Sequence, residues 1–245
     1  MEIIIDQDYE SMSAKAAEQV LKLIKNVDKP LLCIATGDSP KGFYKSIIGK
    51  IKKGNIDISN WHFVGLDEWM GMNITDEGSC RYHLENDLLR PLNVPENRVC
   101  FFDGSARDIQ NEIEKTENFI KEQGGIEVAI VGLGMNGHVG MNEPGTDPAS
   151  HSHISTIAEE TQKVGQKYFT KAQMLSKGIT LGIADIMDAR NVILLINGAK
   201  KGRIAQQVLE EEISPGLPAS LLRRHKHYTV YLEKEAAQFL QKSNA

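Results

Sequence analysis

A glycine-rich segment in the middle of the chain holds the residues best suited to proton transfer. Residues 132–145 read Gly-Leu-Gly-Met-Asn-Gly-His-Val-Gly-Met-Asn-Glu-Pro-Gly, with His138 and Glu143 five positions apart and Asn136 beside them. A carboxylate near a histidine fixes its tautomer and raises its basicity, so that the imidazole can move protons near neutral pH. We therefore interpret this segment as catalytic, against the alternative of a histidine that only satisfies backbone groups in a tight turn.

The same segment also matches the dinucleotide-binding pattern G-x-G-x-x-G, from Gly132 to Gly137. A true fingerprint needs a helix that opens at its last glycine, whereas here Pro144 and two further glycines follow closely. We therefore expect no nicotinamide cofactor, and no other cofactor is demanded. We also expect no metal, since only one histidine lies near these acids and a convincing ligand set is missing.

Two adjacent carboxylates, Asp67 and Glu68, follow the strand-like run 62–66. Neighbouring side chains at the end of a strand face different ways, so one carboxylate can enter a pocket while the other caps a backbone or pairs with a cation. The alternative is a pair of solvated acids at an ordinary loop. Their position at a strand end, combined with the other loops, favours a functional role for one of the two.

A third loop, Thr36-Gly37-Asp38-Ser39, joins a strand to a helix that has Pro40 in its first turn. Glycine lets a backbone approach closely, and the free N–H groups of a first helical turn attract an anion. The hydroxyls of Thr36 and Ser39 can add donors, and we expect Asp38 to point away from the anion. The alternative is a plain helix cap without a ligand.

These loops must be positioned by strands and helices that alternate along the chain. We expect strands at 31–35, 62–66, 128–131, 191–196 and 228–232, and helices at 11–26, 40–53, 106–123, 158–170 and 199–212. The pattern predicts an α/β fold: a single-domain, Rossmann-like, three-layer open sheet, mainly parallel, with helices on both faces and one domain over residues 1–245. Ligands bind beyond the carboxyl ends of such strands, where the three loops can converge.

The composition excludes several other classes of protein. The formal net charge is -5, which argues against sequence-independent nucleic-acid binding. The three cysteines lack the spacing of a disulfide framework or a structural zinc site. No apolar stretch approaches the length of a membrane span, and the start of the chain is unlike a signal peptide. We expect a cytoplasmic enzyme without nucleic-acid or membrane partners; a homo-oligomer stays possible.

Together, the three loops resemble the glucosamine-6-phosphate deaminase family, the amino-sugar phosphate isomerases. The matching segments are residues 35–40, 66–69, 132–145, 178–182 and 197–201. The resemblance spans nearly the whole chain and implies a hexosamine 6-phosphate substrate. It also implies that Asp67 moves a proton between C2 and C1 and that His138 opens the sugar ring, positioned by Asn136 and Glu143.

The resemblance implies that Lys201 binds the substrate phosphate. The family has an arginine that also binds the phosphate, and the best match for it in this chain is Lys167. A lysine cannot form the bidentate hydrogen bonds of an arginine. Family members often carry Asp where Asn136 stands, so we expect His138 to be less basic here. The segment 145–175 is a candidate lid, since it is polar and flanked by glycines.

Three alternatives concern the substrate and the activity. Residues 66–69, 177–182 and 217–222 look especially like the galactosamine-6-phosphate isomerase branch, which would give tagatose 6-phosphate and ammonia instead of fructose 6-phosphate and ammonia. A 6-phosphogluconolactonase-like hydrolase is the second alternative, although those enzymes commonly have an arginine where Trp69 stands. A non-catalytic sugar-phosphate sensor is the third.

Overall fold

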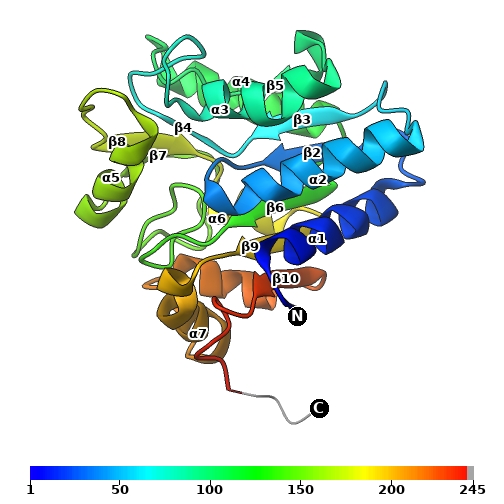
Figure 1. Cartoon of the computed structure of the whole chain (residues 1–245). Coiled ribbons are helices and arrows are strands. Elements are labelled where there is room, and N and C mark those ends of the chain that lie inside the picture. The colour runs from blue at the N-terminus through cyan, green and yellow to red at the C-terminus, as the bar shows by residue number, and fades with distance from the viewer. Residues whose placement is uncertain (242–245) are drawn as a thin grey trace.

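Seven parallel strands form the central sheet of the computed structural model, which describes residues 1–241 (Figure 1). In their order across the sheet they are β1 (Glu2–Asp6), β10 (Tyr228–Glu233), β9 (Asn191–Ile196), β6 (Val128–Gly132), β2 (Leu31–Ile34), β3 (His62–Gly65) and β5 (Val99–Cys100). The inner strands β2, β6 and β9 are almost wholly buried, which explains their uninterrupted apolar runs. The last four residues of the predicted 1–245 domain lie outside the described part.

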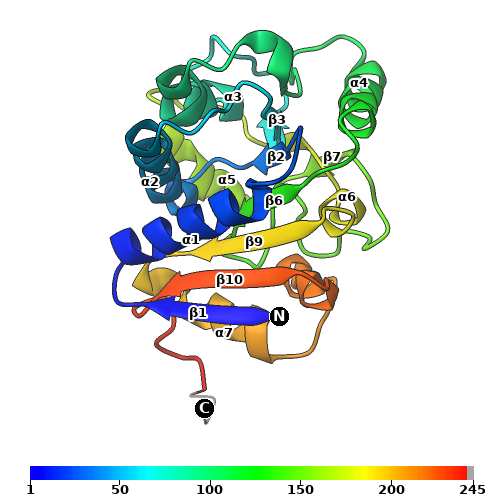
Figure 2. The same cartoon turned by 90° about the vertical axis from the view of Figure 1, so that its right-hand side faces the viewer.

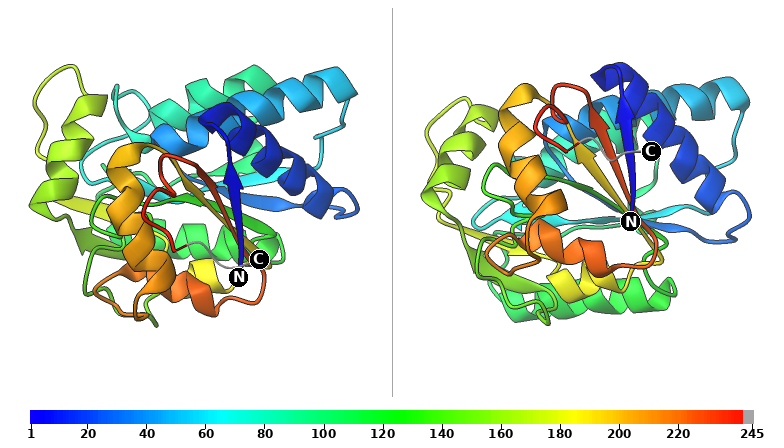
Figure 3. Two further views of the ribbon diagram at one scale, coloured as in Figure 1. Left: turned by 60° about the horizontal axis from the view of Figure 1, so that its bottom comes forward. Right: turned by 90° about the horizontal axis from the view of Figure 1, so that it is seen from below.

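Helices cover both faces of this sheet, as Figures 2 and 3 show. One face carries α1 (Tyr9–Ile24), α2 (Asp38–Gly54) and α3 (Cys80–Leu84), and α3 is continued by η1 (Glu85–Leu89) and η2 (Arg90–Leu92). The other face carries α4 (Ile109–Glu122), α6 (Ile183–Met187), α7 (Gly202–Glu210) and η6 (Pro218–Arg224). A separate hydrophobic cluster fills the space under each helical layer. The predicted three-layer, mainly parallel α/β fold is confirmed.

A second, antiparallel sheet lies beyond the carboxyl ends of the central strands (Figure 1). Its strands are β4 (Asp67–Trp69), β8 (Lys177–Thr180) and β7 (His153–Thr156), and α5 (Glu159–Gly165) with η4 (Gln166–Tyr168) follows β7 in the chain. The sequence does not predict this sheet, because β4 has three residues and continues β3 after Leu66. The edge strand β1 and the short turn η3 (Glu96–Arg98) are also absent from the prediction.

Two predicted helices differ from the observed ones. The helix expected over 158–170 is only α5 and one 3-10 turn, because glycine at position 165 weakens a helix and packs directly against Trp69. The helix expected over 199–212 begins with the 3-10 turn η5 (Ala199–Lys201) and ends at Glu210. Within residues 1–241, no helix is both long and apolar enough to cross a membrane.

Candidate active site

A cavity of about 730 Å³ lies at the carboxyl ends of four neighbouring strands, β9, β6, β2 and β3. From β2 the chain continues to β3 on one side, and it later returns to β6 on the other, so the cavity lies where the strand order reverses. Open α/β sheets bind their ligands at such a point. Seven of the residues predicted from the sequence line the cavity: Thr36, Gly37, Ser39, Asp67, His138, Lys167 and Lys201.

Asp67 is the buried carboxylate of this cavity. It begins β4 and pairs in register with Thr180 of β8, so the small sheet fixes its backbone. Its exposed fraction is 8%, and burial raises its pKa to about 6. A carboxylate with a raised pKa accepts a proton more readily near neutral pH than an ordinary aspartate does.

Glu68 faces away from Asp67 and holds the backbone of the next helix. Its carboxylate accepts hydrogen bonds from the backbone N–H groups of Trp69 (2.8 Å), Cys80 (2.9 Å) and Arg81 (2.9 Å). Glu68 is 1% exposed, and burial raises its pKa while these three donors counteract the rise. The pair therefore divides its roles as alternation along a strand predicts: Asp67 lines the cavity and Glu68 fixes the start of α3.

His138, Asn136 and Glu143 form a hydrogen-bonded chain behind the cavity wall. Nδ1 of His138 lies 2.6 Å from Oδ1 of Asn136, and Nδ2 of Asn136 donates to Oε2 of Glu143 over 2.7 Å. Because the amide oxygen of Asn136 can only accept, Nδ1 of His138 carries the proton and Nε2 keeps its lone pair. Only His138 of the three lines the cavity, so Asn136 and Glu143 act on a ligand through it.

The environment keeps His138 neutral before a ligand arrives. Burial lowers the pKa of His138, whereas the carboxylate of Glu143 raises it, and the nearby charge of Lys201 lowers it further. Thr161 of α5 also reaches this group, with Oγ1 at 3.2 Å from Nδ1 of His138. A neutral imidazole with a free Nε2 is ready to accept a proton.

The other end of the cavity is built to hold an anion. Gly37 has a φ of 115°, in the region that favours glycine, and it precedes the first turn of α2. Ser39 donates from Oγ to Oδ1 of Asn197 (2.6 Å) and accepts from Nζ of Lys201 (3.3 Å). Burial lowers the pKa of Lys201 to about 8. This end combines free N–H groups of a helix start with an ammonium group, as anion sites do.

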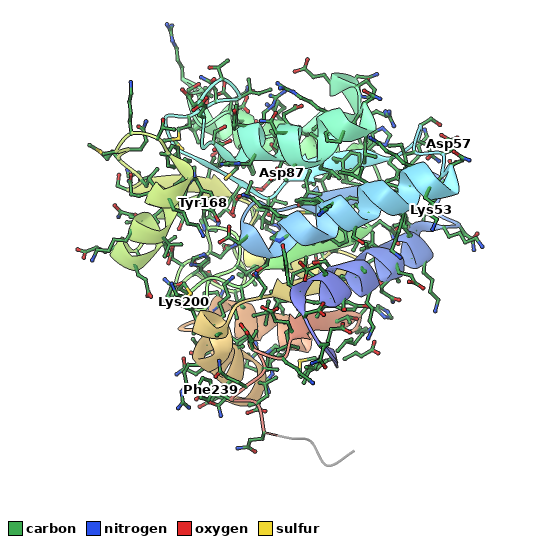
Figure 4. The ribbon with its side chains drawn as sticks, viewed as in Figure 1. Lys53, Asp57, Asp87, Tyr168, Lys200 and Phe239 are labelled. Atoms are coloured by element: carbon green, nitrogen blue, oxygen red, sulfur yellow. The ribbon has the colours of Figure 1, made fainter. Side chains whose placement is uncertain are left out.

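Lys167 and Asp38 form an ion pair across the mouth of the cavity. Asp38 was expected to turn away from the anion, but both residues line the cavity, because the cation on η4 lies beside the first turn of α2. The ring of Tyr168, a residue labelled in Figure 4, lies 4.8 Å from Nζ of Lys167 and thus next to this pair. The segment after β7 therefore contributes part of the cavity wall.

Several cavity residues were missed by the sequence analysis as site residues: Cys80, His83, Thr161, Tyr168 and Asn197. Asn197 directly follows the predicted strand 191–196, so its position at a strand end is a signal that could have found it. The others lie on α3 or on the segment after β7, and no local pattern points to the cavity. Within residues 1–241, no group of three or more His, Cys, Asp or Glu side chains is arranged to hold a metal ion.

The fold and the cavity define an α/β protein that combines an anion-binding helix start with a carboxylate and an imidazole for proton transfer. Residues 6–231 match the family model described as glucosamine-6-phosphate isomerases/6-phosphogluconolactonase, and the chain belongs to this family. Two similar relatives are glucosamine-6-phosphate deaminases. The one from Shouchella clausii (strain KSM-K16) is 36% identical over 97% of this chain and 96% of its own; the one from Thermoanaerobacter sp. (strain X514) is 35% identical over 98% and 95%.

Solved structures agree with this assignment. The structure of a monomeric glucosamine-6-phosphate deaminase is 31% identical to this chain, with a TM-score of 0.93 over 97% of this chain and 99% of its own. A 6-phosphogluconolactonase from Thermotoga maritima is 21% identical, with a TM-score of 0.75 over 95% of this chain and 98% of its own. The second likeness shows the shared fold alone.

Proposed function

We propose that this chain is an amino-sugar phosphate isomerase and deaminase, which converts a hexosamine 6-phosphate and water into a ketose 6-phosphate and ammonia. The observation that carries this proposal is one cavity lined by Asp67, His138 and the anion-binding residues around Lys201. Isomerisation needs a carboxylate at C2, ring opening needs a second acid/base at the ring oxygen, and phosphate binding holds the open chain in place.

The first step in this proposal is ring opening by His138. Its Nε2 accepts the proton of the hydroxyl on C1 and delivers a proton to the ring oxygen, which breaks the bond between C1 and that oxygen. The imidazole becomes positively charged between these transfers. The carboxylate of Glu143, 3.8 Å from Nδ1, stabilises that charge electrostatically, and Asn136 holds the two groups in place by hydrogen bonds of 2.6 and 2.7 Å.

The second step is proton transfer by Asp67. The carboxylate removes the proton from C2 and returns it to C1. The aldehyde oxygen on C1 takes up the proton that the ammonium group on C2 releases, so the C=O double bond at C1 is replaced by a C=N iminium bond at C2. Water then adds at C2 and ammonia leaves. A pKa of about 6 keeps Asp67 mainly ionised at neutral pH, yet basic enough to take a proton from carbon.

We take glucosamine 6-phosphate as the first substrate to test, because it is the one in the names of the similar relatives. Galactosamine 6-phosphate is the second, because residues 66–69, 177–182 and 217–222 resemble that branch of the family. A lactonase activity has less support, since the likeness to lactonases lies in the fold. In addition, the hydrogen-bonded connection from His138 through Asn136 to Glu143 suits ring opening, in which the imidazole becomes positively charged.

The test is an ammonia-coupled assay of the purified chain with both hexosamine 6-phosphates, and a separate hydrolysis assay with 6-phosphogluconolactone. We expect ammonia from at least one hexosamine phosphate and loss of that activity in His138→Gln. The matched control His153→Gln, which changes a half-buried histidine on β7 outside the cavity, should retain the activity. A folded protein that releases no ammonia from either sugar, or that hydrolyses only the lactone, contradicts the proposal.

A further inference from the structure

His83 lies on the cavity wall between the carboxylate end and the anion-binding end. It stands one helical turn after Cys80, a cavity residue whose thiol lowers the pKa of Asp67. On its other side, the His83 ring meets the ring of Tyr168 edge-on at 5.4 Å. Tyr168 lies against the anion-binding loop, since its hydroxyl is 3.7 Å from where a Cβ on Gly37 would stand. The wall thus runs from Asp67 past His83 to Gly37.

His83 has a buried nitrogen without a partner. Neither ring nitrogen makes a hydrogen bond to any residue among 1–241. Nε2 is shielded from solvent whereas Nδ1 is not, so Nδ1 is the nitrogen that a ligand in the cavity can reach. Buried polar groups in folded proteins are nearly always paired, so an imidazole on a cavity wall with both nitrogens unpaired is suited to bind a polar group of a ligand. The mechanism proposed above gives His83 no role, so its unpaired nitrogens need a separate explanation.

The charge state of His83 suits a hydroxyl group better than a phosphate. Burial lowers the pKa of His83, and the nearby charge of Lys41 lowers it further. A neutral imidazole has one donor and one acceptor nitrogen, and a hydroxyl likewise donates and accepts. A phosphate only accepts, and it has Lys201 and the helix start at the other end of the cavity.

The position of His83 is fixed from three sides. Glu68 holds the backbone at the start of α3, the Tyr82 ring meets the His83 ring at 5.7 Å, and the Tyr168 ring meets it at 5.4 Å. When a ligand lacks the hydrogen-bonding group that a rigid polar side chain needs, the lost hydrogen bond is not replaced. The site therefore discriminates strongly against that ligand. These contacts make His83 suited to specificity.

We infer that His83 is a specificity-determining residue that hydrogen-bonds the hydroxyl on C4 of the hexosamine 6-phosphate; this inference rests on the proposed function. C4 is the midpoint between C2, which Asp67 serves, and C6, which carries the phosphate. It is also the one carbon at which glucosamine and galactosamine 6-phosphate differ. His83 therefore selects between the two sugars.

The test compares kcat/KM of the wild type, His83→Phe and His83→Asn on three substrates: both hexosamine 6-phosphates and their common 4-deoxy analogue. In the wild type we expect the preferred epimer to exceed the 4-deoxy analogue by roughly tenfold or more. In His83→Phe we expect the ratio of the preferred epimer to the 4-deoxy analogue to fall below about threefold. The ratio between the two epimers should fall below about threefold as well. In His83→Asn both ratios should lie between those of His83→Phe and the wild type. His227→Phe, the same substitution at an exposed histidine outside the cavity, is the matched control and keeps the wild-type ratios.

Two results overturn different claims. If His83→Phe lowers kcat/KM for all three substrates by the same factor, His83 does not contact the C4 hydroxyl and the inference is wrong. If the folded wild type releases ammonia from none of the three, the proposed function itself is wrong. Thermal unfolding of each variant shows whether the fold is intact, and His83→Asn supplies the ratios if His83→Phe does not fold.

Discussion

The imidazole of His138 and the carboxylate of Glu143 do not touch: Nδ1 and Oε1 lie 3.8 Å apart. Both are instead bonded to Asn136, which accepts from the imidazole and donates to the carboxylate. A neutral amide transmits orientation but carries no charge. The structure therefore supports the sequence-based expectation that His138 is less basic here than beside a direct carboxylate partner.

Asn136→Asp should raise the pKa of His138, because a carboxylate then accepts directly from Nδ1. In the proposed mechanism the free enzyme needs His138 neutral, so activity should rise with pH through this pKa. We expect the ascending limb of kcat/KM against pH to move to higher pH, together with the His138 titration followed by ¹⁵N NMR. Asn73→Asp, at a partly exposed turn residue outside the cavity, is the matched control. An unchanged ascending limb and titration in Asn136→Asp contradict the assignment.

Gly134→Ala should displace the imidazole while leaving the fold intact. A Cβ at Gly134 would lie 2.3 Å from Cδ2, Cε1 and Nε2 of His138, so the ring must move. Misplacement of a catalytic group by about 1 Å can cost roughly a hundredfold in rate, and we expect a fall in kcat of that order. Gly49→Ala, on α2 with open space around it, is the control: full activity and about 0.5–1 kcal/mol more stability. Near-normal kcat in Gly134→Ala contradicts this account.

Lys201 should set the descending limb of the pH profile. Burial lowers its pKa to about 8, and only the protonated form attracts a phosphate, so kcat/KM falls as the pH rises through that value. Lys201→Arg should remove this limb, because the pKa of arginine exceeds about 12. Lys200→Arg, on the neighbouring residue, is the control and should keep it. A descending limb that stays at the same pH in Lys201→Arg shows that another group titrates.

The sequence predicted the fold and the three loops because each signal is local. An apolar strand followed by glycine and proline marks the turns at 36–40 and 132–145, and parallel strands place all their carboxyl ends at one edge. The small sheet could not be predicted, because three-residue β4 acquires its structure only by pairing with β8. His83 and Tyr168 were missed for a related reason: only long-range packing of α3 against η4 brings them to the cavity.

The central claim assigns two separable proton transfers to Asp67 and His138 in one cavity. Glucosamine 6-phosphate labelled with deuterium at C2 tests it directly, or the galactosamine epimer if that sugar is the substrate. For Asp67→Asn we predict that ring opening, followed as anomer exchange by NMR, stays faster than without enzyme. The same variant should keep the C2 label and release ammonia roughly 10² to 10⁴ times more slowly than the wild type. If Asp67→Asn loses the label and releases ammonia at the wild-type rate, Asp67 is not the base and the account is wrong.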